Sequence, residues 1–161
     1  MLKETSVKEI MNTSVVSITK ETPLKEVVRL LENHPFSGLP VVDEQERVIG
    51  IISEKDILKH TRWIMGRPFN LEKVLQDYEA TTVEDQRGLE MIELVASTNA
   101  GTLMTDDVIT VNQEAPIMEA VKMINQNNIN RLPVVDNQQK LVGIVTRANL
   151  IVIMEKWVEN S

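Results

Sequence analysis

Cysteine is absent from this chain and aromatic residues are scarce, and each shortage excludes a class of structure. Without cysteine among the 161 residues, disulfide bonds, zinc–thiolate sites and cysteine nucleophiles are all excluded. Aromatic residues make up 3% of the chain against a hydrophobic share of 42%, so aliphatic side chains must fill the core. The length suits one domain of ordinary size.

Positive charge is also in short supply. The 17 Lys and Arg residues face 24 Asp and Glu residues, and the net charge of −7 disfavours the basic face that nucleic-acid binding requires. The longest apolar runs, Val48–Ile52 and Leu150–Met154, are far too short to span a bilayer, and the N-terminus lacks the apolar stretch of a signal peptide. We therefore expect a cytoplasmic protein that neither binds nucleic acid nor inserts into a membrane.

The feature that is present is an internal repeat. The letters LPVVD stand at 39–43 and recur at 132–136. The same spacing continues without a gap, so that residues 11–57 form one copy and residues 104–150 form the other. Identical pairs at this spacing include Met11 and Met104, Pro23 and Pro116, and Gly50 and Gly143.

Each copy carries the same predicted elements in the same order. A short β-type run, 15–18 or 108–111, precedes a helix whose apolar residues recur at i, i+3, i+4 and i+7. Two further β-type runs flank a polar turn and predict a hairpin, after which a second helix begins. We expect Thr22 to cap the first helix of copy one and Pro23 to occupy its first turn.

This pattern predicts an α+β fold (α/β in some schemes) of two tandem β-α-β-β-α repeats. One copy is too small to bury its sheet face alone, so we expect the two to pack in one compact module with pseudo-twofold symmetry. The predicted parts are a first repeat at 1–59, a helical inter-repeat segment at 60–102, and a second repeat with a C-terminal helix at 103–161. Within the segment, helices are expected at 70–75 and 83–96.

The order of strand, helix, LPVVD strand, turn and G-I-I-S-x-x-D resembles the CBS domain, and two copies in tandem resemble a CBS pair, or Bateman module. The resemblance implies a stand-alone regulatory protein that senses adenine nucleotides (AMP, ADP or ATP) in clefts between the repeats. It also implies an allosteric relay to an unknown protein partner, and a homodimer.

The start of the last helix in each copy is the candidate ligand site. Free N–H groups at a helix N-terminus favour phosphate, and a carboxylate such as Asp56 can accept both hydroxyls of a ribose. The same residues also match a capping box, in which Ser53 and Asp56 stabilise the helix start. The two roles are compatible.

The resemblance implies two ligand sites, each drawing on both copies. Site A would join Ser53 and Asp56 to Ile109, Asn130, Arg131 and Pro133, with Ile109 against the base and Arg131 facing phosphate. Site B would join Thr146, Arg147 and Asn149 to Val16, Ser37, Gly38 and Pro40.

Site B departs from the family pattern. Asn149 replaces the acid, which leaves one acceptor and one donor where a carboxylate offers two acceptors. Gly38 replaces the counterpart of Arg131, so a cation is missing, although Arg147 could substitute for it. We therefore expect charged nucleotides at site A and weaker binding at site B.

Neither a phosphate-binding glycine loop nor a dinucleotide-binding glycine motif is present. The two histidines, His34 and His60, have no ligand partners at metal spacing, and no nucleophile–base pair stands out. We expect no enzyme activity, no required cofactor and no metal site. Two alternatives stay open, namely an interaction scaffold with degenerate sites and a sensor of S-adenosylmethionine or cyclic di-AMP.

Overall fold

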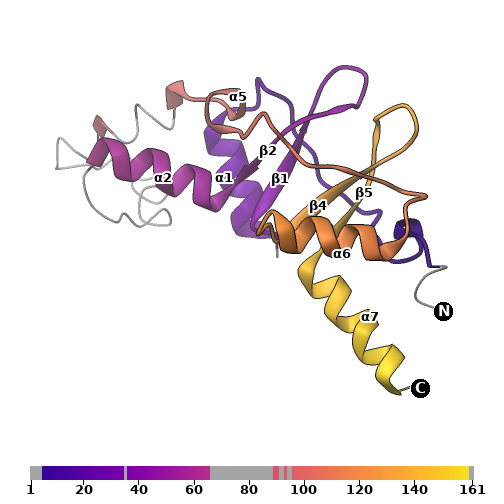
Figure 1. Cartoon of the computed structure of the whole chain (residues 1–161). Helices are drawn as coiled ribbons and strands as arrows, with labels where there is room; N and C mark the ends of the chain where they lie inside the picture. The colour runs from indigo at the N-terminus through magenta and orange to yellow at the C-terminus, as the bar shows by residue number, and fades with distance from the viewer. Residues whose placement is uncertain (1–4, 35, 66–88, 91–92, 94–95, 160–161) are drawn as a thin grey trace. The chain divides into compact units, whose positions relative to one another are not determined.

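The two copies of the repeat fold into matching elements in the same order, except that, among the residues that the structure describes, only copy two has a strand before its first long helix (Figure 1). The computed structural model describes residues 5–34, 36–65, 89–90, 93 and 96–159. Copy one comprises η1 (Val7–Glu9), α1 (Leu24–Asn33), β1 (Gly38–Val42), β2 (Val48–Ser53) and α2 (Glu54–Met65). Copy two comprises α5 (Ala100–Leu103), β3 (Val111–Asn112), α6 (Ile117–Gln126), β4 (Arg131–Val135), β5 (Leu141–Thr146) and α7 (Arg147–Glu159).

The helices α1 and α6 bury the face that the sequence predicts. In α1 the four residues at i, i+3, i+4 and i+7 are all buried, namely Leu24, Val27, Val28 and Leu31. In α6 their counterparts Ile117, Ala120 and Ile124 are buried, and Val121 packs against the same cluster. Residues at this spacing lie on one side of a helix, so the apolar stripe is what attaches each helix to its sheet.

The hairpins also form as predicted, whereas the first β-type run of each copy is shorter. Strands β1 and β2 pair in one sheet, and β4 pairs with β5 in antiparallel register in the other. From the predicted runs 15–18 and 108–111, only β3 forms a strand, parallel to β4, while Ile18 makes a single parallel bridge to Val41. The remaining residues of those runs have no ladder partner in the part of the chain that the structure describes.

An aspartate opens each hairpin turn. Oδ1 of Asp43 accepts hydrogen bonds from the backbone N–H groups of Gln45 and Arg47, both at 2.9 Å, and Asp136 repeats the arrangement in copy two. Burial alone would raise the pKa of Asp43. The net effect is a lowered pKa, because the carboxylate accepts hydrogen bonds from Arg47 and Gln45 and lies beside the positive charge of Arg47. In both turns, a side-chain oxygen of the first residue therefore accepts the backbone N–H groups of the turn.

The expectation that Thr22 caps α1 is wrong. The N-cap residue is Pro23, which has no side-chain cap, and the first helical N–H, that of Leu24, donates to the carbonyl of Thr98 at 2.9 Å. In the same way, the N–H of Ile117 in α6 donates to the carbonyl of Thr5 at 2.9 Å. A backbone carbonyl from elsewhere in the chain thus satisfies a donor that a capping side chain usually satisfies.

These carbonyls belong to two corresponding stretches, which we call the first arm (residues 5–12) and the second arm (residues 98–105). Asn12 of the first arm exchanges two hydrogen bonds with Ile144 of copy two, both 2.9 Å long. Thr105 of the second arm exchanges two with Ile51 of copy one, at 2.8 and 3.1 Å. Each copy therefore has its arm packed on the body of the other copy.

The exchange explains why the two compact units are discontinuous in sequence. One unit consists of Met1–Val16, Val42–Ile49 and Asp107–Ser161, and the other consists of Ser17–Val41 and Gly50–Asp106. The correspondence between the copies starts at residues 5 and 98, earlier than the identities at 11 and 104 indicate.

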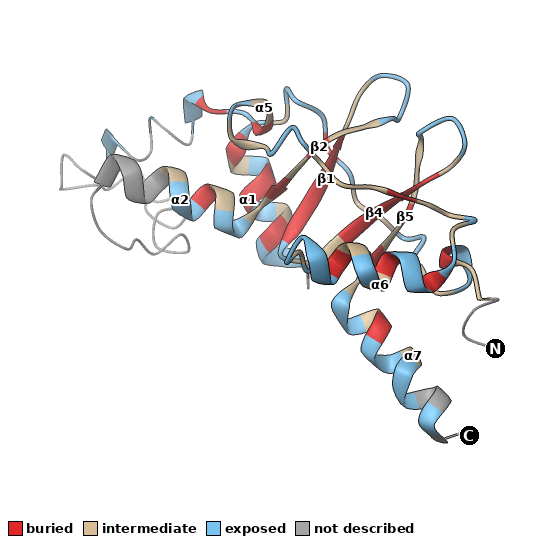
Figure 2. Cartoon of the chain, in the orientation of Figure 1, coloured by how far each residue is buried: buried red, intermediate tan, exposed pale blue. Residues whose placement is uncertain are grey.

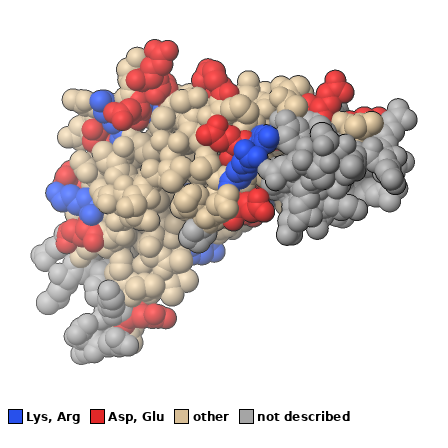
Figure 3. Space-filling view, turned by 180° about the vertical axis from the view of Figure 1, so that it is seen from behind, with Lys and Arg blue, Asp and Glu red and all other residues tan. Residues whose placement is uncertain are grey.

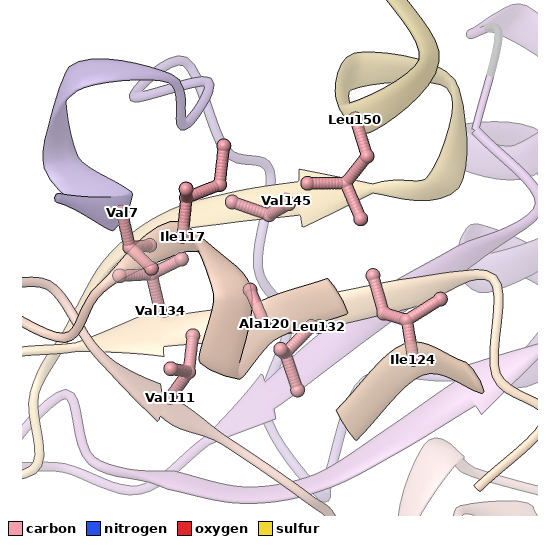
Figure 4. Close-up of a cluster of buried hydrophobic side chains, with 9 residues drawn as sticks. All are labelled: Val7, Val111, Ile117, Ala120, Ile124, Leu132, Val134, Val145 and Leu150. Carbon is pink, nitrogen blue, oxygen red and sulfur yellow. The ribbon is translucent and has the colours of Figure 1, made fainter. Parts of the chain in front are cut away.

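The first arm contributes directly to the core of its unit. Val7 is fully buried among side chains of β3, β4, β5, α6 and α7 (Figure 4). Aliphatic residues alone make up this cluster, as the shortage of aromatic residues requires. Its buried members are Val7, Val111, Ile117, Ala120, Ile124, Leu132, Val134, Val145 and Leu150.

Exposure differs sharply between the strands and the last helix (Figure 2). Most of β1 and β4 is buried, whereas α7 exposes apolar side chains along its length, including Ile151, Met154 and Val158. On the described part of the face in Figure 3, acidic and basic side chains are interspersed. Among the described residues, no helix has the length and apolar character needed to cross a membrane.

The predicted helix at 70–75 lies outside the described residues, as does most of the one at 83–96.

Candidate functional site

The start of α2 is organised around Ser53 and Asp56. Oδ2 of Asp56 accepts a hydrogen bond from the backbone N–H of Ser53 at 2.8 Å and another from its hydroxyl at 2.5 Å. The hydroxyl of Ser53 in turn accepts from the N–H of Asp56 at 3.4 Å. This is the reciprocal capping box that the sequence predicts, and it holds the carboxylate of Asp56 against the helix start.

The start of α7 repeats the arrangement with an amide. Oδ1 of Asn149 accepts from the N–H of Thr146 at 2.9 Å and from its hydroxyl at 2.7 Å, and the N–H of Asn149 donates to that hydroxyl at 3.2 Å. One acceptor oxygen is enough to cap a helix in this way, so Asp56 and Asn149 can both serve as the capping residue. They differ in the second oxygen: Oδ1 of Asp56 has no hydrogen-bond partner among the described residues, and Asn149 carries an NH₂ donor there instead.

The loop before each hairpin approaches the same helix start. The N–H of Glu54, the first residue of α2, donates to the carbonyl of Ser37 at 3.2 Å, and the N–H of Arg147, the first residue of α7, donates to the carbonyl of Asn130 at 2.9 Å. The predicted site residues Ser37 and Asn130 therefore lie beside the capping boxes of their own copies.

Arg131 lies at the edge of the second copy's site. It is the first residue of β4 and is the register partner of Thr146 in β5. Its atom Nη1 is buried, although the residue as a whole is half-buried. Arg147 reaches the same loop, because its Nη2 donates to the carbonyl of Ile129 at 3.4 Å. The corresponding position in copy one, Gly38, carries no cation.

The residues predicted for each joint site are divided between the two units. Of site A, Ser53 and Asp56 lie in the unit that contains α2, while Ile109, Asn130, Arg131 and Pro133 lie in the unit that contains α7. Of site B, Val16, Thr146, Arg147 and Asn149 lie in the α7 unit, while Ser37, Gly38 and Pro40 lie in the α2 unit. Both joint sites stay predictions, and the contacts described above are those within a unit.

Burial also distinguishes the predicted residues. Pro40 and Pro133 are buried strand residues, and Ile109 packs against the core cluster of its unit. Asn130 and Ser37 are exposed, and Val16 is half-buried. Ligand contact at Pro40 or Pro133 therefore stays a prediction, whereas core packing at both positions is already visible.

A pocket of about 740 Å³ opens beside Asp56, within the α2 unit. One wall is α2, through Asp56, Lys59 and His60, and the other is the second arm, through residues 102–105. Pockets of about 300–1,000 Å³ are the usual size for small-molecule ligands. The volume and the mixed polar and apolar lining suit a small ligand that has both hydrogen-bonding groups and an apolar part.

Sequence reasoning missed Lys59, His60 and the second arm as parts of this site. The signal was available for the first two, because positions i, i+3 and i+4 from Asp56 share one face of a helix. No comparable signal marks the arm, since it comes from the other copy. Within the described part of the chain, no group of His, Asp or Glu side chains could hold a metal ion.

Comparison with known proteins identifies the family of the chain. The family model of the CBS domain matches residues 7–62 and 100–156. An uncharacterized protein of Methanocaldococcus jannaschii, MJ1426, is 33% identical over 152 residues, which cover 90% of this chain and 88% of that protein. CBSX2, a chloroplastic CBS domain-containing protein of Arabidopsis thaliana, is 28% identical over 134 residues, which cover 83% of this chain and 56% of that protein.

Two solved structures have the same fold. A crystal structure of CBSX2 in complex with AMP superposes with a TM-score of 0.68 at 24% identity, over 94% of this chain and 96% of that one. The CBS domain pair of protein MJ0100, in complex with 5′-methylthioadenosine and S-adenosyl-L-methionine, superposes with a TM-score of 0.61 at 25% identity, over 94% and 97%. The family model covers both copies and starts within both arms, and on that basis the chain belongs to the CBS domain family, as a tandem pair of CBS repeats.

Proposed function

We propose that this CBS pair is a regulatory module that binds an adenine nucleotide (AMP, ADP or ATP) and relays its occupancy to a partner protein. The observation that carries the proposal is the carboxylate of Asp56, which Ser53 holds in place and which lines a pocket of ligand size. The complexes of CBSX2 with AMP and of MJ0100 with adenosyl compounds support an adenosyl ligand.

The chemistry of the helix start fits such a ligand. The capping box uses only Oδ2 of Asp56, so Oδ1 is left to accept a ribose hydroxyl. Hydrogen bonds to a charged group contribute about 1.5–3 kcal/mol each. The N-terminus of α2 also favours an anion, because its N–H groups and its dipole present positive charge.

The proposed relay runs through the two walls of the pocket. Helix α2 leads into the inter-repeat segment, and the second arm leads out of it into copy two. A ligand that contacts both walls stabilises the conformations in which the distance between the walls matches the ligand. It can shift the populations of the conformations only as far as its affinities for them differ. The partner protein, a cytoplasmic location and the homodimer stay predictions.

The residues of copy two that would complete site A are also part of the proposal. Arg131 would face the phosphate and Ile109 the base, as the resemblance implies. Arg131→Ala tests this part separately, because a ligand without phosphate should bind that variant as well as it binds the wild type.

Two observations favour a second candidate, an interaction scaffold in which one site has degenerated. Asn149 lacks the second carboxylate oxygen, and Gly38 carries no cation, so the second site offers less charge to a nucleotide. A sensor of S-adenosylmethionine or cyclic di-AMP is a further alternative, and the MJ0100 complex supports the adenosylmethionine version.

Calorimetric titration of the nucleotide-free chain tests the proposal, with AMP, ADP, ATP and S-adenosylmethionine as ligands. Asp56→Asn is the informative variant, because Asn149 already shows that an amide maintains the capping box. We expect Asp56→Asn to weaken nucleotide binding by about tenfold or more with little loss of stability, and the matched control Asn149→Asp to retain binding. No heat with any nucleotide, or equal affinity in Asp56→Asn, would overturn the proposal, and a clear preference for S-adenosylmethionine would favour the alternative.

A further inference from the structure

Helix α2 presents two basic side chains to the same pocket as Asp56. Lys59 and His60 follow Asp56 by three and four positions, and all three line the pocket. Among the described residues, neither of these two basic side chains makes a hydrogen bond or an ion pair. Asp56, the acid three positions before Lys59, is instead held at the helix start by Ser53. The pocket thus contains two basic side chains that form no ion pair with a described acidic side chain.

The second copy lacks this feature. The counterparts of Lys59 and His60 in α7 are Val152 and Ile153, and Val152 is 49% exposed. The two helices share their capping box but differ in chemistry one turn later. A scaffold role that both copies share therefore does not require basic residues there.

We propose that Lys59 and His60 bind the anionic group of the ligand whose hydroxyls Asp56 accepts, in addition to Arg131, which the proposed function assigns to the same group. The proposal rests on the proposed function, since it concerns the same pocket. Lys provides a compact positive charge for phosphate, and an imidazole N–H can donate to the same oxygens. Thr105 of the second arm lines the opposite wall, and a threonine hydroxyl there can donate as well.

The spacing along α2 restricts the class of ligand. Three to four residues of α-helix correspond to a rise of about 5 Å, so the anionic group must lie within about one helical turn of the hydroxyls. A phosphate attached directly to the sugar satisfies this condition, as in a nucleoside monophosphate. The α-phosphate of ADP or ATP satisfies it as well, whereas S-adenosylmethionine has no phosphate.

The test compares AMP with adenosine, which differs only by the phosphate, on the full-length chain. The variant is Lys59→Met combined with His60→Gln, and the matched control is Lys55→Met, which removes a charge from the same helix at a position outside the pocket lining. We expect the double variant to bind AMP at least about tenfold more weakly and adenosine within about twofold of the wild type. The control should bind both ligands like the wild type.

The other outcomes distinguish failure of this inference from failure of the proposed function. If the double variant binds AMP like the wild type while Asp56→Asn weakens binding, this inference is wrong and the proposed function stands. An equal loss of AMP and adenosine affinity also overturns the inference, because the two side chains would then not contact phosphate. If the wild type binds neither ligand, this inference is wrong, and the proposed function fails too if ADP and ATP also give no heat. Should thermal unfolding show that the double variant does not fold, the two single variants replace it, with the same expected selectivity for AMP.

Discussion

The sulfur of Met104 lies over Gly50, 2.7 Å from the place where a β-carbon on that glycine would stand. Met11 lies over Gly143 in the same way, with a corresponding distance of 2.5 Å. Each methionine belongs to the arm of one copy and each glycine to a hairpin strand of the other. The two contacts, together with the hydrogen bonds of Asn12 and Thr105, make the exchange of arms a reciprocal feature of the fold.

A β-carbon at position 50 should therefore loosen the second arm. Gly50→Ala places a methyl group against Met104 and 3.1 Å from the carbonyl oxygen of Thr105, and overpacking of this kind costs about 1–3 kcal/mol. Urea unfolding of Gly50→Ala measures the loss. The cost should shrink in a Met104→Ala background, where the methionine no longer occupies the space. An identical cost in both backgrounds would show that Met104 does not cover Gly50.

The first arm should contribute measurably to stability through one side chain. Val7 is 0% exposed, so Val7→Ala should lower the free energy of unfolding by about 2 kcal/mol, through lost burial and a residual cavity. Lys8→Ala is the neighbouring control, because Lys8 is exposed and its ion pair with Glu114 is a surface one, worth about 0–1 kcal/mol. A Val7→Ala cost no larger than that of Lys8→Ala would mean that the arm is detached in solution.

The cap of the first arm should make stability depend on pH. The backbone N–H of Ser6 and its hydroxyl donate to the carboxylate of Glu9, both at 2.8 Å, and lower its pKa from the usual 4.5. Because the pKa of Glu9 is lower in the folded than in the unfolded chain, the stabilisation is complete above the unfolded value and is lost as pH falls through the folded value.

Glu9→Gln should thus be less stable than the wild type at pH 7, and the difference should close below the lowered pKa. Unfolding curves from pH 7 to pH 3 measure it. Glu44→Gln, at an exposed turn residue with no described hydrogen bond, serves as the control. A Glu9→Gln difference that persists unchanged at pH 3 would contradict this account.

The capping boxes predict a graded response at Asp56. Asp56→Ala removes the acceptor of both Ser53 hydrogen bonds and should cost about 1 kcal/mol, the usual cost of losing a cap. Asp56→Asn should cost less, because Asn149 fulfils the same role in copy two. Thermal unfolding without ligand measures the loss of stability in Asp56→Ala and in Asp56→Asn. Equal losses of stability would mean that the charge, not the hydrogen bonds, stabilises the helix start.

Much of the fold follows from the repeat, but the exchange of arms does not. The periodic apolar residues of α1 and the paired β-type runs identify the helices and hairpins, because side-chain burial imposes those periods. In the repeat, Met11 corresponds to Met104 and Gly50 to Gly143. These identities would be the same if each arm packed on its own copy, so they do not predict the exchange of arms. The local sequence around Thr22 likewise does not show that the first N–H of α1 bonds to the backbone carbonyl of Thr98.

The candidate site is likewise only partly predictable from the sequence. Ser53 and Asp56 could be identified because a capping box is a local pattern and the resemblance adds a ligand role. Lys59 and His60 lie on the same helix face, so their contribution could be predicted once the helix was known. The second arm could not, because its place beside Asp56 depends on contacts between residues about 50 positions apart.

The most direct test is a crystal structure of the full-length chain with AMP at saturating concentration. We expect AMP in the pocket between α2 and the second arm, with a ribose hydroxyl within hydrogen-bond distance of Oδ1 of Asp56 and the phosphate beside Lys59 and His60. An empty pocket at saturating AMP, or a ribose bound only at Asn149, would contradict it.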